Sequence, residues 1–150
     1  PGPGGYGAIL DYKGNRKELS GGFRLTTNNR MELIAAIKAL EALKKPCVVT
    51  LYSDSQYVVD AIEKGWAKHW KAHDWRRPRN KGMASNPDLW KRLLQLTDRH
   101  AIRFRWVRGH AGNIENERCD RLAVEAASRH HLPPDTGYES TAQSEHVRMV

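Results

Sequence analysis

The sequence predicts a single α/β domain, because runs that alternate apolar and polar residues are interspersed with runs that repeat apolar residues at helical spacing. Its 150 residues are enough to bury a core without disulfide or metal support. Apolar residues make up 39% and charged residues 28%, which excludes a disordered chain poor in hydrophobic residues. We expect this domain to cover residues 1–130, and a poorly ordered tail to cover residues 131–150.

A β-hairpin is expected first, and a long helix follows it. Residues 6–12 and 18–25 have strand character, and the Gly-Asn pair at 14–15 tolerates the positive φ angles of a tight turn. The Asn-Asn pair at 28–29 is an N-cap signal for an amphipathic helix that ends before Pro46.

Three further helices and another strand are expected in the middle of the chain. The β-branched run 48–52 predicts a buried strand, after which residues 53–55 can cap a helix that ends near residue 64. Residues 66–73 predict a short helix, and Asn-Pro-Asp at 86–88 opens a longer one.

The last part of the chain predicts one strand, one loop and one helix. Residues 102–107 alternate in the manner of a strand with one polar face. The loop 109–112 (Gly-His-Ala-Gly) has glycine at both ends, and the final helix begins at Asn113 or Glu115 and runs to about residue 129.

The net charge of +8 is concentrated in one segment. Six of these charges lie within residues 64–81, which also contain Trp66, Trp70 and Trp75. Cations interleaved with aromatic residues are typical of surfaces that meet nucleic acid. A solvated basic face is the alternative, which the density of cations disfavours.

Location and cysteine chemistry follow from what the sequence lacks. No apolar run approaches the roughly 18 residues of a membrane span, and the first residues have no basic region of a signal peptide. We therefore expect a cytoplasmic protein with no membrane contact.

Cys47 and Cys119 have no metal-binding spacing, so we expect two reduced, packed thiols.

Three acidic residues stand where structural roles explain them poorly. Glu32 lies at the margin of the apolar stripe of its helix, Asp54 follows a predicted strand, and Asp120 shares its helix face with alanine and valine. Each has an ordinary alternative: an acid at a helix start, an N-cap, and a partner for a neighbouring arginine.

A shared site explains the three carboxylates better if they converge at one edge of the sheet. Carboxylates in contact repel one another unless cations hold them, and oxygen ligands alone suit Mg²⁺ or Mn²⁺. A pair of such ions beside a basic surface is suited to phosphodiester hydrolysis.

Five short motifs then extend this interpretation: residues 27–33 (Thr-Asn-Asn-Arg-Met-Glu-Leu), 54–57 (Asp-Ser-Gln-Tyr), 88–90 (Asp-Leu-Trp), 109–120 and 135–138 (Asp-Thr-Gly-Tyr). In type, order and interval they resemble the bacterial type 1 ribonuclease H family over almost the whole chain. The resemblance implies a metal-dependent endonuclease that cuts the RNA strand of RNA/DNA hybrids and leaves 5′-phosphate and 3′-hydroxyl ends.

The resemblance also implies catalytic roles. Glu32, Asp54 and Asp120 correspond to ligands of Mg²⁺, with Mn²⁺ as a substitute. His110 corresponds to a residue that assists proton transfer or product departure, a task that suits its ordinary pKa near 6.5.

The implied partner is an RNA/DNA hybrid bound by a monomer. Asn28, Asn29 and Gln56 correspond to minor-groove contacts, since their amides can both donate to and accept from a 2′-hydroxyl. Thr27 and Arg30 correspond to a pocket for a phosphate of the DNA strand.

The basic segment corresponds to a protrusion that grips the hybrid. Lys68 and Lys71 would neutralise backbone phosphates. Trp66 and Trp70, one helical turn apart, lie against a deoxyribose or simply pack, and the sequence leaves both readings open.

The implied fold is the ribonuclease H-like fold, a mixed five-stranded sheet of order 3-2-1-4-5 with helices on both faces. The family's first strand carries a fourth carboxylate and would pair with residues 6–12 and 48–52, but residue 1 already matches the proline that follows it. We expect that the chain is trimmed or that this strand is supplied from elsewhere. Otherwise metal binding and cleavage should be weak.

Two alternatives to a hybrid-cleaving nuclease stay open. A hybrid-binding module without catalysis would explain the missing carboxylate. A nuclease for DNA junctions on the same fold is the other, which the amides of Asn28, Asn29 and Gln56 disfavour.

Overall fold

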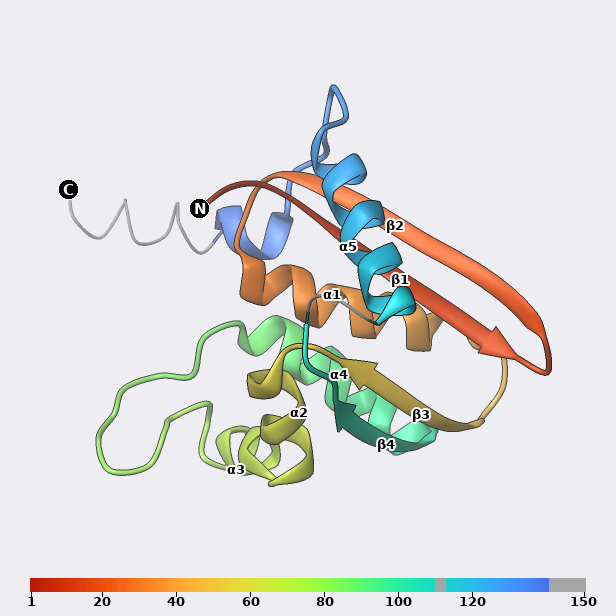
Figure 1. Cartoon of the computed structure of the whole chain (residues 1–150). Coiled ribbons are helices and arrows are strands. Elements are labelled where there is room, and N and C mark those ends of the chain that lie inside the picture. The colour runs from red at the N-terminus through yellow and green to blue at the C-terminus, as the bar shows by residue number, and fades with distance from the viewer. Residues whose placement is uncertain (110–112, 141–150) are drawn as a thin grey trace.

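Two strand pairs form the β-structure of this computed structural model, which describes residues 1–109 and 113–140 (Figure 1). β1 (Gly2–Tyr12) pairs antiparallel with β2 (Asn15–Thr26). β3 (Val48–Ser53) pairs parallel with β4 (Ala101–Trp106). Both pairings agree with the expected strand order, but within the described residues no strand joins the two pairs into one sheet.

Helices cover both faces of the β1–β2 hairpin. The labelled helices are α1 (Asn28–Glu41), α2 (Gln56–Glu63), α3 (Trp66–Ala72), α4 (Pro87–Arg99) and α5 (Ile114–Ala127), and residues 136–140 are also helical. A methyl group added at Gly5 would meet α5, whereas one added at Gly4 would meet Met31 of α1. Because successive strand residues point to opposite faces, α1 and α5 lie on opposite sides of β1 (Figure 1). None of the described helices has the length and apolar character needed to span a membrane.

The main hydrophobic core lies between α1, α2, α3, α4 and β4. Helix α1 contributes the predicted stripe, in which Leu33 and Ile37 are at most 1% exposed. Trp90 and Leu93 of α4 are completely buried opposite this stripe. The expected helices are therefore confirmed by the packing of their apolar faces.

The hairpin turn and the N-cap of α1 each lie one residue earlier in the chain than the sequence predicts. The positive φ angles of the hairpin fall at Lys13 (50°) and Gly14 (82°), so that Tyr12 and Asn15 close the turn. Helix α1 is capped by Thr27, which is extended and whose Oγ1 accepts a hydrogen bond from the backbone N–H of Arg30 at 3.3 Å.

The prediction that β3 is a buried strand is wrong. Val48 is 90% exposed and Tyr52 is 66% exposed, because only one edge of this strand is paired and one of its faces is uncovered. β1 likewise pairs along one edge only.

A cavity of about 560 Å³ lies between the unpaired edges of β1 and β3. Residues 5–11 and 49–53 form two of its walls, and side chains of α1 and α5 form the others. This is the position that the resemblance assigns to the family's first strand.

The segment after α5 differs from the poorly ordered tail that the sequence predicts. The backbone N–H of Arg24 donates to the carbonyl of Pro133 at 3.0 Å, and Asp135 is only 4% exposed. Glu139 accepts two hydrogen bonds from the Nε of Arg24 and one from its Nη2, at 2.9 to 3.2 Å. Short polar contacts thus hold residues 133–139 on the domain, while residues 141–150 lie outside the described part of the chain.

The close approach of α5 to β1 predicts a sharp difference between two glycines of one strand. A methyl group at Gly5 would overlap the backbone carbonyl of Ala123, so Gly5→Ala should lower the free energy of unfolding by about 2 kcal/mol. Gly2→Ala is the control, because nothing lies within 4 Å of its added methyl group. Urea unfolding measures both variants, and equal stabilities would contradict the proposed packing.

Candidate active site

Five acidic residues of the described chain line the cavity, and the three that the sequence predicts as metal ligands are among them; the other two are Asp11 and Glu115. Glu32 lies on α1, Asp54 directly follows β3, and Asp120 lies on α5. The end of a strand and two helices on opposite faces of β1 thus bring together residues that are up to 88 positions apart.

The electrostatics of Glu32 indicate that these groups lie close together. Its pKa is raised to about 7, first by burial, then by the negative charge of Asp54, by a hydrogen bond with the Asp54 side chain, and by the charge of Asp120. The carboxyl group of Glu32 therefore keeps its proton at pH values where an isolated carboxyl group would release it.

Two of the ordinary roles considered, an acid at a helix start and an N-cap, do not account for Glu32 and Asp54. Ser55 caps α2, since its Oγ accepts from the backbone N–H of Val58 at 3.2 Å, so Asp54 is not the cap. Glu32 lies beyond the first turn of α1. Arg118, considered as a partner for Asp120, instead forms an ion pair with Glu18 at 2.8 Å.

The backbone around Asp54 is held in place by its neighbours. Its carbonyl accepts a hydrogen bond from Nε1 of Trp106 at 3.2 Å, which ties the end of β3 to the end of β4. A methyl group on Gly109 would lie 3.3 Å from Oδ2 of Asp54, so the start of the 109–112 loop passes directly beside this carboxylate.

The donor set fits a hard divalent cation. Glu32, Asp54 and Asp120 offer only carboxylate oxygens, and their mutual repulsion is relieved by positive charge. Within residues 1–109 and 113–140, no three acidic, histidine or cysteine side chains already form a group that could hold a metal ion.

One polar residue of the cavity escaped sequence reasoning. The side-chain Nδ2 of Asn116 is buried and has no hydrogen-bond partner within the described residues. It lies close to Gly109 and lines the same cavity as the carboxylates. The sequence places Asn116 within the motif 109–120 but assigns it no role, so only the structure identifies it. His110 lies outside the described residues.

The residues expected to contact the minor groove are available for binding. Asn28 and Asn29 lie in the first turn of α1, and Gln56 begins α2. All three residues are exposed, and the two helices are capped by Thr27 and Ser55 and not by these amides.

Arg30 does not have the role that the sequence predicts. It is 3% exposed, and all five N–H groups of its guanidinium are used: by Asp135 at 2.7 and 2.9 Å, by Asp88 at 2.8 and 2.9 Å, and by Asn86 at 3.2 Å. No donor remains for a phosphate. Burial raises the pKa of Asp135, but hydrogen bonds from Arg30 and Thr26 outweigh this effect and leave that pKa below its ordinary value.

Trp70 is also a structural residue. It is 6% exposed, and its ring lies 5.7 Å from that of Trp90 and 6.3 Å from that of Tyr57, so the packing alternative is correct. Trp66 is 38% exposed, and Nζ of Lys64 lies 5.5 Å from its ring centroid.

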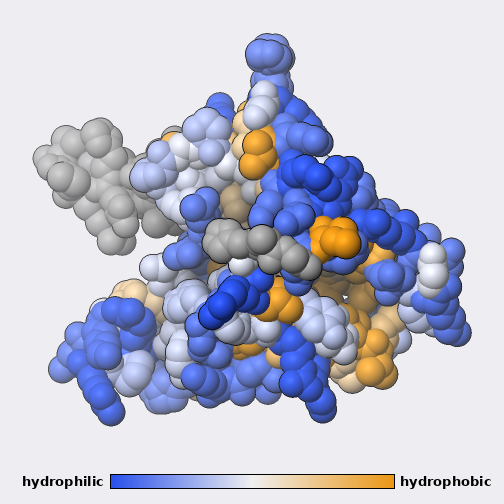
Figure 2. Space-filling model, in the orientation of Figure 1, coloured by the Kyte–Doolittle hydropathy of each residue, from blue (hydrophilic) through white to orange (hydrophobic). Residues whose placement is uncertain are grey.

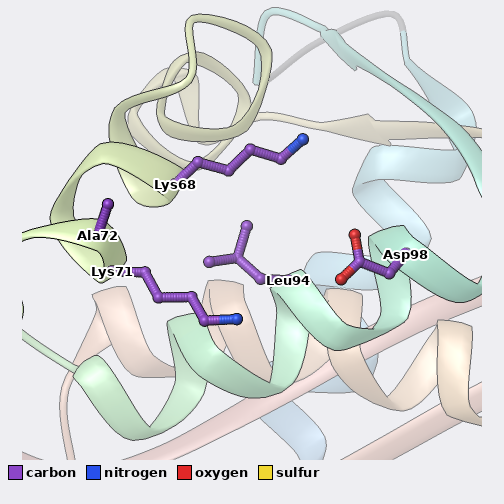
Figure 3. Close-up of a pocket in the computed structure, with 5 residues that line it drawn as sticks. All are labelled: Lys68, Lys71, Ala72, Leu94 and Asp98. Atoms are coloured by element: carbon purple, nitrogen blue, oxygen red, sulfur yellow. The ribbon is translucent and has the colours of Figure 1, made fainter.

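The lysines of α3 are exposed beside a shallow pocket of about 360 Å³ (Figure 3). Lys68 and Lys71 extend along it, and Leu94 and Asp98 of α4 form its other side. Figure 2 shows a largely hydrophilic surface over α3 and the loop that follows it. This surface can meet a polyanion.

Known proteins resemble this chain in both sequence and fold. The family model described as RNase H matches residues 1–128. Ribonuclease H of Syntrophus aciditrophicus is 67% identical over 138 residues, which cover 92% of this chain and 79% of that protein. The chain belongs to the ribonuclease H family.

Other relatives support the assignment to the ribonuclease H family. Ribonuclease HI of Synechocystis is 55% identical over 92% of this chain and 86% of its own length. The crystal structure of LC9-RNase H1, a type 1 enzyme with the type 2 active-site motif, superposes with a TM-score of 0.70 at 34% identity. The match covers 83% of this chain and 63% of that one, so the chain spans less than two thirds of LC9-RNase H1.

A more distant structure bears on the fold alone. The N-terminal RNase H domain of a Mycobacterium tuberculosis protein is 23% identical and has a TM-score of 0.64 over 85% of this chain and 89% of its own. Ribonucleases H depend on divalent metal ions, which agrees with the carboxylate oxygens that Glu32, Asp54 and Asp120 offer in the cavity.

The raised pKa of Glu32 predicts that this residue destabilises the metal-free protein at high pH. Its carboxyl group is neutral in the folded state up to about pH 7 but ionises near 4.5 when unfolded, so the cost grows between these values and is complete above 7. Glu32→Gln should therefore raise the free energy of unfolding by on the order of 1 to 3 kcal/mol at pH 8, and by little at pH 4.

Urea unfolding in EDTA at the two pH values measures this effect. Glu41→Gln, an exposed residue of the same helix, controls for the loss of one charge. An equal gain from Glu32→Gln at both pH values would show that Glu32 is not held close to the other carboxylates.

Proposed function

We propose that the chain hydrolyses the RNA strand of RNA/DNA hybrids in a reaction that depends on Mg²⁺ and leaves 5′-phosphate and 3′-hydroxyl ends. The observation that carries this proposal is the convergence of Glu32, Asp54 and Asp120 on one cavity. Family membership and the names of relatives at 55% to 67% identity support it.

The three carboxylates have the role of metal ligands in this proposal. Bound divalent ions would supply an activated water molecule and stabilise the leaving oxygen. Glu32, Asp54 and Asp120 would hold the ions. The positive charge of the ions would in turn offset the mutual repulsion of the three carboxylates. His110 is proposed to carry a proton to or from the reacting groups, since it follows Gly109, where an added methyl group would lie 3.3 Å from Oδ2 of Asp54.

The proposed substrate is supported by two exposed surfaces of different chemistry. Asn28, Asn29 and Gln56 present amides that match 2′-hydroxyls in a minor groove. Lys68 and Lys71 present positive charge on the separate short helix α3, where phosphate contacts would add salt-dependent affinity. Trp66 is exposed beside them and is proposed to contact a sugar.

A hybrid-binding module without turnover is the second candidate function. It is favoured by the cavity between β1 and β3, where unpaired strand edges form two walls beside the carboxylates. Binding and cleavage are therefore measured separately below. In either case we propose a cytoplasmic monomer.

Asp54→Asn tests the proposed metal site. The substitution removes one negative ligand charge while keeping the shape of the side chain, so cleavage of a labelled hybrid in Mg²⁺ should fall by at least about 100-fold. Binding of the hybrid in EDTA should be retained. The matched control is Asp60→Asn on α2, which removes only an ion pair with Lys64 at 3.5 Å.

The outcomes separate the two candidate functions. Cleavage that survives Asp54→Asn would refute the metal-site assignment. A wild-type chain that binds the hybrid without cleaving it, even at high Mn²⁺ concentration, would favour the binding module.

Competition between protons and metal at Glu32 predicts a pH-dependent Mg²⁺ affinity. Because the pKa of Glu32 is about 7 without metal, a proton must leave before the ion binds at lower pH. Affinity should fall by up to about tenfold per pH unit below 7 and level off above it. Calorimetric titration with MgCl₂ between pH 5.5 and 8.5 measures this, and Glu32→Gln should bind more weakly without that slope.

A further inference from the structure

One buried carboxylate oxygen binds residues on both sides of the N-terminal turn of α1, taken here as the N-cap Thr27 together with Asn28 and Asn29. Oδ2 of Asp135 accepts a hydrogen bond from Oγ1 of Thr26 at 2.7 Å and from Nε of Arg30 at 2.7 Å. Thr26 and Arg30 are the residues immediately before and after this turn. A single atom from the segment after α5 therefore joins its two flanks.

The contacts of this carboxylate are shielded from water and use the full hydrogen-bonding capacity of the arginine. Thr26, Arg30 and Asp135 are 2%, 3% and 4% exposed. The other donors of Arg30 bind Asp88 and Asn86 at the start of α4. Charge-assisted hydrogen bonds in such surroundings are strong and geometrically specific, so neither flank of the turn can move without breaking one.

The segment that supplies Asp135 is itself held in one position. Arg24 binds it through the carbonyl of Pro133 and through the carboxylate of Glu139. A methyl group at Gly137 would overlap both the carboxylate of Asp88 and the guanidinium of Arg30, so it would have to displace them. Contacts of the residues before and after Asp135 in the chain thus fix its position.

We propose that Asp135 is a positioning residue for recognition of the RNA strand, acting through Thr26 and Arg30 on Asn28 and Asn29. Those two amides are exposed between the anchored flanks, whereas Asp135 is buried and cannot touch nucleic acid. The inference rests on the proposed function, in which the amides contact 2′-hydroxyls. Such contacts require the donor and acceptor atoms of the two amides to lie at defined positions. The buried carboxylate of Asp135 fixes those positions by holding the flanking residues.

The test compares Asp135→Asn with the wild-type chain in binding to two ligands of the same base sequence. Fluorescence anisotropy in EDTA gives the affinity for a labelled RNA/DNA hybrid and for the corresponding DNA duplex. The hybrid should bind about tenfold more weakly, while binding to the DNA duplex, which depends on phosphate contacts, should change by less than about twofold. In Mg²⁺, KM for the hybrid should rise by a similar factor with kcat unchanged.

Two further variants keep the test independent of stability. Thr26→Val removes only one of the two hydrogen bonds to Oδ2 and should weaken hybrid binding by about threefold, even if Asp135→Asn does not fold. Glu41→Gln breaks an exposed ion pair with Arg92 that joins α1 to α4 at the opposite end of α1, and it should leave both affinities unchanged.

The results distinguish three conclusions. Loss of hybrid preference in Asp135→Asn or Thr26→Val, with DNA binding retained, supports the positioning role. Unchanged hybrid binding in folded variants, or an equal loss for both ligands, would overturn it. A wild-type chain that binds neither ligand would instead overturn the proposed function on which the inference rests.

Discussion

The candidate active site depends on the direct contact between the backbone of α5 and strand β1. Gly5 and Gly7 have no side chains on the face that meets this helix, and a methyl group at either position would overlap a backbone carbonyl of Ala123 or Cys119. The helix therefore lies closer to the strand than any larger residue permits. Asp120 follows Cys119 directly, so this contact brings its helix position over the cavity that Glu32 and Asp54 also line.

The same geometry places like charges together at a cost that folding must offset. Burial and the neighbouring carboxylates raise the pKa of Glu32, which means that the folded chain holds these groups against their mutual repulsion. Packing of α1 and α4 supplies the opposing free energy, since Leu33, Ile37 and Trp90 are almost completely buried. A stable scaffold thus carries a locally unfavourable site, which is a common feature of catalytic centres.

The parts of the fold that follow from local patterns could be predicted, and those that depend on distant contacts could not. The stripe of α1 and the hairpin were predicted because spacing and turn residues act within a few positions. Burial of Arg30 could not be predicted, because its two carboxylate partners lie 58 and 105 residues away. The exposure of Val48 depends on the missing pairing of a strand edge, which the sequence of β3 does not contain.

The candidate site shows the same division. Glu32, Asp54 and Asp120 were predicted from residue types, motif spacing and resemblance, but Asn116 was missed because nothing local marks its burial.

The packed segment around Asp135 has a practical meaning for the limits of the domain. The family model ends at residue 128, yet a protein shortened to that point would leave Arg30 buried opposite Asp88 with half of its counter-charge gone. The smallest unit that keeps this arginine fully neutralised and hydrogen-bonded therefore extends beyond residue 135.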